Sequence, residues 1–554
     1  MGVLNPKLYS VIQRHISPIK QSIKVINNES DVMSIVRDTL MLNIDGCEVN
    51  YKINVNSILQ QSQSEGIFFK NIRIVNSKLH KGISFYDVKI KGNLYFWENQ
   101  CSTCDFSNIK VEGCSYFSNT IFRSSVVFDH AQFDKDCFFW GVEFLGESYF
   151  RNCTFGGRID FWCANFSKKS DLSHSLFCKD VDFSNTVFSQ DILFKETSFG
   201  NDGYSSAAIF DNLICGGGVC FIGSNFRDEI SMNKSEFSGL IDFSKCSIYR
   251  TLTLALTSYT QISFDFSHIY SPVYLLDCSN NVEYISFQHS WIDSIVSIRC
   301  VREFSINQMI FYKSIFSNKS IVSIEGANMS DGMFDFSFCN ILGVVSVYSS
   351  LLERLNIICS SVIGSLIIKD TNIKLIDLTN STATGRIITD SNYCYSPQNR
   401  ETANILRHQK ESEGDVIMSL KYKELEMRRY KEDFDKLPIL ERLKNIDEII
   451  IVKLNFWSND YGQSWMRGVV FTLLISFIFT YILTIIDYDG KIDGIVYYVS
   501  NQYFWKDVIN FLWVPSMEFK SHGLLYVIIA LLGKILVAYG MFQTAMSFRK
   551  YSKS

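Results

Sequence analysis

The sequence predicts a mainly β solenoid that is joined by a helical connector to two transmembrane helices. Three observations predict this class: a large apolar residue that recurs every five or six positions, a charged segment rich in helix formers, and two long apolar runs near the C-terminus. At 554 residues the chain is too long for one compact core. The use of 45 Phe and only 6 Pro indicates that one apolar side chain serves a repeat.

The repeat is clearest from residue 117, where large apolar residues follow one another at alternating steps of five and six. Neither the period of a helix nor that of a strand fits these steps. A small or β-branched residue stands two positions before each large one, as Thr120 does before Phe122. This pairing suits a narrow coil filled by its own side chains. The predicted core includes Phe117, Phe122, Phe128, Phe133, Phe139 and Phe144.

The segments SNTVF, KETSF and DHAQF resemble units of the pentapeptide-repeat family, with an extra residue in every second unit. The resemblance implies a right-handed quadrilateral β-helix, which we expect over residues 66–396 after an N-terminal cap region at 1–65. After Leu254 the ladder becomes aliphatic, and Ile363 and Ile388 are among its expected members. Residues 256–335 are the least regular and are a place suited to partner contacts.

A helical connector is predicted at residues 397–466, which contain many helix-forming residues. Gly414 and Asp415 predict a turn and a cap between two helices. Pro438 predicts the start of a further helix, from Ile439 to Leu454.

The membrane domain is predicted at residues 467–554, with spans at 468–486 and 524–547. The first span carries no charge, and the second carries one, Lys534. Basic residues before the first span and after the second predict that both ends are cytoplasmic and that the loop between the spans is external. The N-terminus lacks the apolar stretch of a signal peptide, so we expect a cytoplasmic solenoid with free thiols.

Lys534 is the first candidate site residue, because a cation in mid-span must face water or a polar partner. Together with Tyr539 and Gln543 it either lines a pore that favours anions or holds neighbouring helices together. The aromatic loop between the spans is either a re-entrant pore element or an interfacial helix. Its candidate residues are Trp505, Trp513 and Glu518.

The segments LRHQKESEGDVIMSLKYKELEMRRY, SNDYGQSWMRG and GMFQTAMSFRKY resemble the C-terminal module of bacterial pentapeptide-repeat membrane proteins, which include anti-phage effectors of the Hailong type. The resemblance implies a channel-like effector in the bacterial inner membrane that disrupts the membrane potential. It also implies a partner nucleotidyltransferase, whose oligonucleotide product is the candidate ligand. Two spans need further copies to enclose a pore, so we expect a homo-oligomer, for example a tetramer, in contact with membrane lipid.

Other functions have less support in the sequence. The balance of 53 basic and 57 acidic residues argues against binding to duplex nucleic acid and against a DNA-mimicking rod. The eight His form no catalytic motif, and Cys101 and Cys104 lack the second pair that a metal site needs, so we expect neither an enzyme, a cofactor nor a metal. The alternative to a channel is a membrane-tethered scaffold whose solenoid binds proteins.

Overall fold

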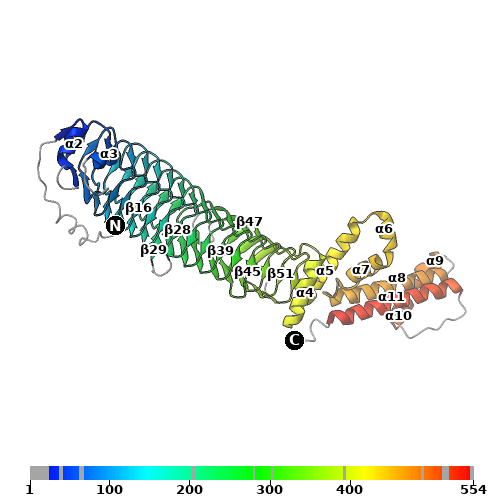
Figure 1. Ribbon diagram of the computed structural model, residues 1–554. Coiled ribbons are helices and arrows are strands. Elements are labelled where there is room, and N and C mark those ends of the chain that lie inside the picture. The colour runs from blue at the N-terminus through cyan, green and yellow to red at the C-terminus, as the bar shows by residue number, and fades with distance from the viewer. Residues whose placement is uncertain are drawn as a thin grey trace. The chain divides into compact units, whose positions relative to one another are not determined.

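The fold is a parallel β-solenoid of about 15 turns with four sheets, followed by helices (Figure 1). This computed structural model describes residues 24–36, 41–61, 68–201, 206–278, 281–300, 305–390, 395–487, 492–513 and 523–548. The chain divides into two compact units, Met1–Leu351 and Leu352–Ser554. The predicted order of β-helix, helical connector and two long apolar helices is confirmed.

In the first unit, one coil consists of four two-residue strands. They are β14 (Ile121–Phe122), β15 (Val126–Val127), β16 (Gln132–Phe133) and β17 (Cys137–Phe138). The next strand, β18 (Glu143–Phe144), pairs in parallel with β14 and sets Phe122 beside Phe144. One coil therefore contains two repeats of eleven residues, each made of one step of five and one step of six residues.

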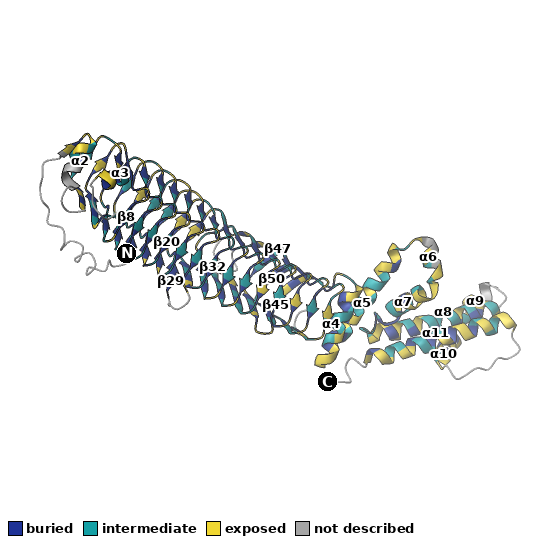
Figure 2. Cartoon of the chain, in the orientation of Figure 1, coloured by how far each residue is buried: buried dark blue, intermediate teal, exposed yellow. Residues whose placement is uncertain are grey.

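The predicted Phe ladder fills these coils, and Figure 2 shows the buried residues along their inner side. Rings of successive coils stack: Phe117 and Phe139 have centroids 4.6 Å apart, and Phe139 and Phe161 have centroids 4.7 Å apart. Stacked aromatic pairs contribute about 0.5–1.5 kcal/mol each beyond the burial of their area. The six predicted core residues are all fully buried: Phe117, Phe122, Phe128, Phe133, Phe139 and Phe144.

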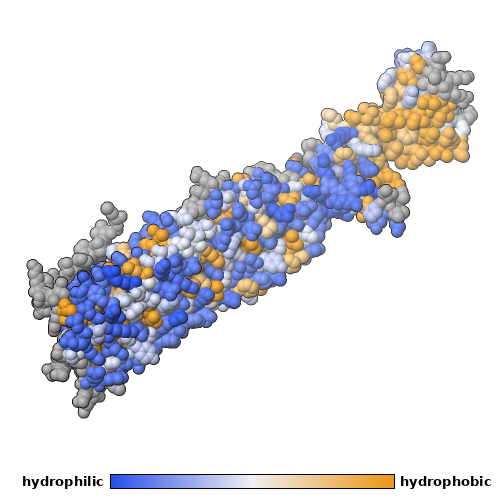
Figure 3. Space-filling view, turned by 90° about the horizontal axis from the view of Figure 1, so that it is seen from above, coloured by the Kyte–Doolittle hydropathy of each residue, from blue (hydrophilic) through white to orange (hydrophobic). Residues whose placement is uncertain are grey.

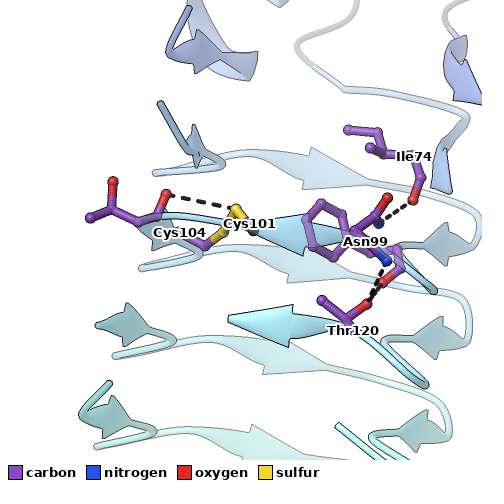
Figure 4. Close-up of a disulfide and its surroundings, with 7 residues drawn as sticks. Ile74, Asn99, Cys101, Cys104 and Thr120 are labelled. Atoms are coloured by element: carbon purple, nitrogen blue, oxygen red, sulfur yellow. Dashed lines mark hydrogen bonds between the residues drawn. A yellow bond between two sulfur atoms is a disulfide. The ribbon is translucent and has the colours of Figure 1, made fainter. Parts of the chain in front are cut away.

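The small residues of the repeat have a second role, because many of them donate a hydrogen bond to the preceding coil. The Thr120 hydroxyl donates to the Phe96 carbonyl at 2.8 Å. The Cys153 thiol lies 3.0 Å from the Phe128 carbonyl in the equivalent position. Buried Asn99 also bridges coils, since its Nδ2 donates to the Ile74 carbonyl (Figure 4). Hydrogen bonding as well as small size therefore explains the Ser, Thr and Cys at these positions.

Cys101 and Cys104 form a disulfide inside the coil (Figure 4). The prediction of free thiols is wrong for this pair. The two residues lie on consecutive strands, β10 (Gln100–Cys101) and β11 (Cys104–Asp105), and both side chains are buried, so the corner between these strands brings the sulfur atoms together. The buried thiols of Cys137, Cys153 and Cys246 are free, as expected.

The corners between strands place non-glycine residues in the left-handed backbone region. Asn108 and Asn152 have φ values of 57° and 56°, and His130 and His174 occupy the same corner of other coils with φ values of 60°. Asn and His are enriched in this conformation. Local backbone geometry thus accounts for two of the scattered His residues.

The region predicted to be irregular has longer strands. In one sheet β40 (Val273–Cys278), β43 (Ile295–Cys300) and β46 (Ile321–Glu325) follow one another. The pairing of β40 with β43 shifts register between Leu275 and Cys278.

The second unit begins with the last strands of the solenoid, among them β51 (Ser361–Val362), β52 (Ser365–Lys369) and β55 (Arg386–Thr389). Two predicted core positions here, Ile363 and Ile388, are wrong by one residue. Val362 is buried whereas Ile363 is 50% exposed, and Ile387 is buried whereas Ile388 is only partly buried.

Helix α4 (Arg400–Glu413) covers the last strands of this unit. The Leu378 amide donates to the Thr402 hydroxyl at 2.9 Å, and Lys410 donates to the Thr389 carbonyl at 2.8 Å. These contacts pair backbone groups at the exposed end of the solenoid, which would otherwise be open to pairing with another strand.

The connector follows the predicted turn chemistry only in part. Gly414 ends α4 with φ 80°, and Asp415 caps α5 (Val416–Lys436), which confirms the predicted turn. The single helix predicted from Ile439 to Leu454 is wrong, because Asn445 interrupts it. The result is two helices, α6 (Ile439–Lys444) and α7 (Ile446–Asn459).

Among the described residues after α7, the structure has four helices: α8 (Trp465–Asp487), α9 (Ile492–Val499), α10 (Gln502–Leu512) and α11 (Leu524–Phe548). In Figure 1, α8 and α11 lie side by side.

We predict that Phe139→Ala destabilises its coil by about 3–5 kcal/mol, the usual cost of emptying a buried Phe site. Hydrogen exchange of the full-length protein should show lost protection around residues 117–161. The neighbouring Phe138, which points outward and is partly exposed, provides the control. Equal loss of protection in Phe138→Ala would contradict the role given to the inner ladder.

Candidate functional site

Helices α8 and α11 form the hairpin on which the site is built. Both are long and apolar enough to span a membrane. In the most apolar 18 residues of each helix only 28% of the residues are buried, whereas a core helix of a soluble protein would be mostly buried. Figure 3 shows apolar side chains gathered over this part of the second unit. The composition and exposure together favour contact with lipid.

Glycines bring the two helices close together. A Cβ atom at Gly540 would lie 2.4 Å from the Thr472 hydroxyl oxygen, and one at Gly468 would lie 2.4 Å from that of Thr544. Both hydroxyls donate to carbonyls one turn earlier in their own helices. The interface therefore has the small residues and internally satisfied hydroxyls typical of membrane helix pairs.

Helix α10 crosses the hairpin near the midpoints of both candidate spans. Ser476 is the twelfth of the 23 residues of α8, and its hydroxyl donates to the Val508 carbonyl at 2.6 Å. Lys534 is the eleventh of the 25 residues of α11, and its Nζ donates to the Trp513 carbonyl at 2.8 Å. The C-terminal half of α10 thus lies level with mid-span. This geometry favours the re-entrant alternative over the interfacial one.

Lys534 has its partner within its own chain. Its side chain is 7% exposed and lies 5.6 Å from the centre of the Phe511 ring, next to the carbonyl of Trp513. Trp513 is the C-cap of α10, where the helix dipole is negative. The ammonium group therefore fixes the end of α10 against the hairpin, which corresponds to the packing alternative considered for this residue.

The surface of α10 is divided into three faces. The face on the hairpin is formed by Phe504, Val508 and Phe511. An exposed apolar face is formed by Trp505, Ile509 and Trp513, which are 55%, 66% and 68% exposed. The third face, which we call the polar stripe, consists of Tyr503, Lys506, Asp507 and Asn510, all of them exposed. Their spacing of three and four residues places them on one side of the helix.

Tyr539 and Gln543 contact the connector helix α7. The Tyr539 hydroxyl donates to Asn455 Oδ1 at 2.9 Å, and Asn459 Nδ2 donates to Gln543 Oε1 at 2.6 Å. Each helix thus contributes two polar residues four positions apart. That matched spacing is visible in the sequence as Asn455 and Asn459, which were not among the predicted site residues.

A carboxylate joins α5 to the start of α8. Asp460 lies between Arg428 of α5, at 3.2 Å, and Arg467 of α8, at 3.1 Å. Beside it, Gln463 Nε2 donates to the Leu420 carbonyl at 2.8 Å. Within the second unit, polar contacts therefore link α5 to the first candidate span.

The remaining candidates give no second site. Glu518 lies outside the described residues. In the part of the chain that the structure describes, no three His, Cys, Asp or Glu side chains are placed to hold a metal ion.

Comparison with known protein families, curated proteins and solved structures found no match. The parallel β-solenoid is consistent with a pentapeptide-repeat-like fold, and two apolar helices follow it.

We predict that Asn459→Leu or Gln543→Leu alone lowers the stability of the hairpin by about 1–3 kcal/mol, because each removes the hydrogen bond between buried Asn459 and partly buried Gln543. The double variant should lose less than the sum of the two single losses, because this hydrogen bond can be lost only once, whereas the contact of the Gly462 amide with Asn459 Oδ1 is lost whenever Asn459 is replaced. Thermal unfolding of the detergent-extracted protein measures the effect. Simple addition of the two single losses would contradict the pairing.

Proposed function

We propose that the protein is an oligomeric membrane channel whose lumen is lined by the polar stripe of α10. The observation that carries the proposal is the position of this stripe, level with the middle of two helices that are able to span a membrane. Hydrocarbon tolerates charged and amide side chains poorly, so such groups face water or protein. Copies of the chain arranged around a common axis would supply a water-filled lumen.

The hairpin supports this role by holding α10 rigidly. Ser476 fixes one turn of α10 and Lys534 fixes its C-terminal end. On the face that packs on the hairpin, Phe511 packs against Phe479 of α8. A lumen-lining helix needs such support, because the lining side chains must keep their positions. Lys534 acts in this proposal as the anchor of α10. That Tyr539 and Gln543 line the lumen stays a prediction.

Both signs of charge occur in the polar stripe, on the adjacent residues Lys506 and Asp507. In the structure the carboxylate of Asp507 accepts a hydrogen bond from the Tyr498 hydroxyl. Charged side chains that line a pore set its preference for anions or cations. The two residues therefore give a test in which opposite changes have opposite effects.

We predict that Asp507→Asn shifts the conducted current towards anions and that Lys506→Gln shifts it towards cations. Purified protein in planar bilayers, with a salt gradient across the bilayer, reports both shifts as opposite changes in reversal potential. Lys423→Gln, at an exposed position of α5, is the control and should leave the reversal potential unchanged. A current whose reversal potential is the same in all variants would place the lumen elsewhere.

The biological setting of the proposal comes from the sequence resemblance over the last 150 residues. On this basis the proposed channel lies in the bacterial inner membrane, and the basic residues that flank the spans favour a cytoplasmic solenoid and C-terminal tail. Opening would depolarise the membrane during anti-phage defence. The control signal would be an oligonucleotide from a partner nucleotidyltransferase, sensed by the cytoplasmic part.

A second candidate function is a membrane-tethered scaffold. It is favoured by large apolar side chains on the outside of the solenoid, including Phe266 and Phe338, which are 60% and 49% exposed. Such side chains suit protein contacts.

The variant Lys534→Leu separates the two functions, because it frees the end of α10 without touching the solenoid. The channel proposal predicts at least a tenfold change in ion flux from protein-containing vesicles. Ile478→Leu, a change on the exposed side of α8, is the control and should leave the flux unchanged. If neither the wild type nor either variant carries flux while the purified chain still captures a protein partner, the scaffold is correct.

A further inference from the structure

Helix α7 has an apolar stripe on the side turned away from the rest of the second unit. Ile446, Ile450, Leu454 and Trp457 follow one another at helical spacing, and Lys453 falls on the same side. Ile446 and Ile450 are each 51% exposed and Trp457 is 63% exposed, while Leu454 is partly buried. Large apolar side chains grouped in this way on one helix mark an interaction surface.

The other side of α7 is already occupied. Val452 is buried in a cluster with Phe434 of α5 and with Tyr461. Asn455 and Asn459 are hydrogen-bonded to α11 through Tyr539 and Gln543. These contacts fix the rotation of α7 about its own axis. The apolar stripe is consequently held outward and cannot turn inward to be buried.

The contacts of α7 also fix its level along the hairpin. Gln543 lies five residues and Tyr539 nine residues before the end of α11 at Phe548. The ring of Phe548 stacks on that of Trp465, the first residue of α8, with centroids 5.3 Å apart. The C-terminal part of α7 therefore lies beside the first turns of α8 and the last turns of α11, at the end of the hairpin marked by this aromatic pair. Aromatic residues at the ends of spans are typical of the membrane–water interface.

We propose that α7 lies in the bilayer interface and that phospholipid covers its apolar stripe. Trp457, at the C-terminal end of the stripe, lies between the two residues of α7 that contact α11 near its end, so the stripe adjoins the lipid-facing surface of the hairpin there. Lys453 lies within the stripe. Its apolar stem would lie along the lipid-covered surface, and its ammonium group would reach the headgroups. The proposal rests on the hairpin being embedded in a membrane and is independent of ion conduction. Helix α7 would in this way attach the connector directly to one leaflet of the membrane.

Photo-crosslinking tests the proposal with the full-length protein in vesicles of phosphatidylethanolamine and phosphatidylglycerol. Benzoylphenylalanine replaces Ile450 in the stripe, Ile478 on the exposed side of α8, or Ile417 on α5. All three side chains are large, aliphatic and 46–58% exposed, so they are matched in accessibility. After irradiation, mass spectrometry identifies lipid adducts, and gel electrophoresis identifies crosslinked copies of the chain.

The proposal predicts phospholipid adducts at positions 450 and 478 and at least tenfold fewer at 417. A crosslinked dimer at position 450 in place of a lipid adduct would overturn the proposal, because a second copy would then cover the stripe. Absence of any adduct at 450, with lipid still captured at 478, would overturn it in favour of a water-exposed helix. Absence of lipid at 478 would remove the membrane from the hairpin, and the channel proposal would fail with it.

Discussion

Polar groups within a hydrocarbon layer must be satisfied by the protein or by water, and the arrangement of the C-terminal helices follows from this requirement. Thr472 and Thr544 satisfy their hydroxyls within their own helices. Ser476 and Lys534 reach across to carbonyls of α10. For an uncompensated lysine at the centre of a span the cost is about 2.5–3.5 kcal/mol on insertion scales. The hydrogen bond to the C-terminal end of α10 offsets part of this cost and at the same time positions α10.

The polar stripe contains exposed side chains that the described part of the protein does not satisfy internally. Asp507 accepts from Tyr498, but within the described residues the side chains of Lys506 and Asn510 have no hydrogen-bond partner. They lie on the same helix whose neighbouring turns are fixed at mid-span depth. A monomer surrounded by lipid would leave them unsatisfied. Assembly around a water-filled lumen would remove this conflict, and for this reason we propose a channel in preference to a simple anchor.

Much of the solenoid could be predicted from the sequence, because its Phe residues are large, isolated and strictly spaced. Where two aliphatic residues are adjacent, as in Val362–Ile363 and Ile387–Ile388, spacing alone did not show which one is buried, and the prediction was wrong by one position. The hydrogen bonds of the small residues were missed because their carbonyl partners lie a whole coil earlier, as Phe96 does for Thr120. The Cys101–Cys104 disulfide depends on a corner geometry that spacing does not fix.

The residues of the site could be predicted from the sequence better than the roles of those residues. Lys534, Trp505 and Trp513 stood out by composition, yet the depth of α10 depends on its contacts with Ser476 and Lys534, which are far apart in the sequence. Imaging of the purified protein in lipid nanodiscs measures that depth most directly. The account predicts several copies around an axis, with α10 at the middle of the bilayer and its polar stripe towards a central opening. A map with α10 at the headgroup level, or with the stripe buried away from any opening, would contradict it.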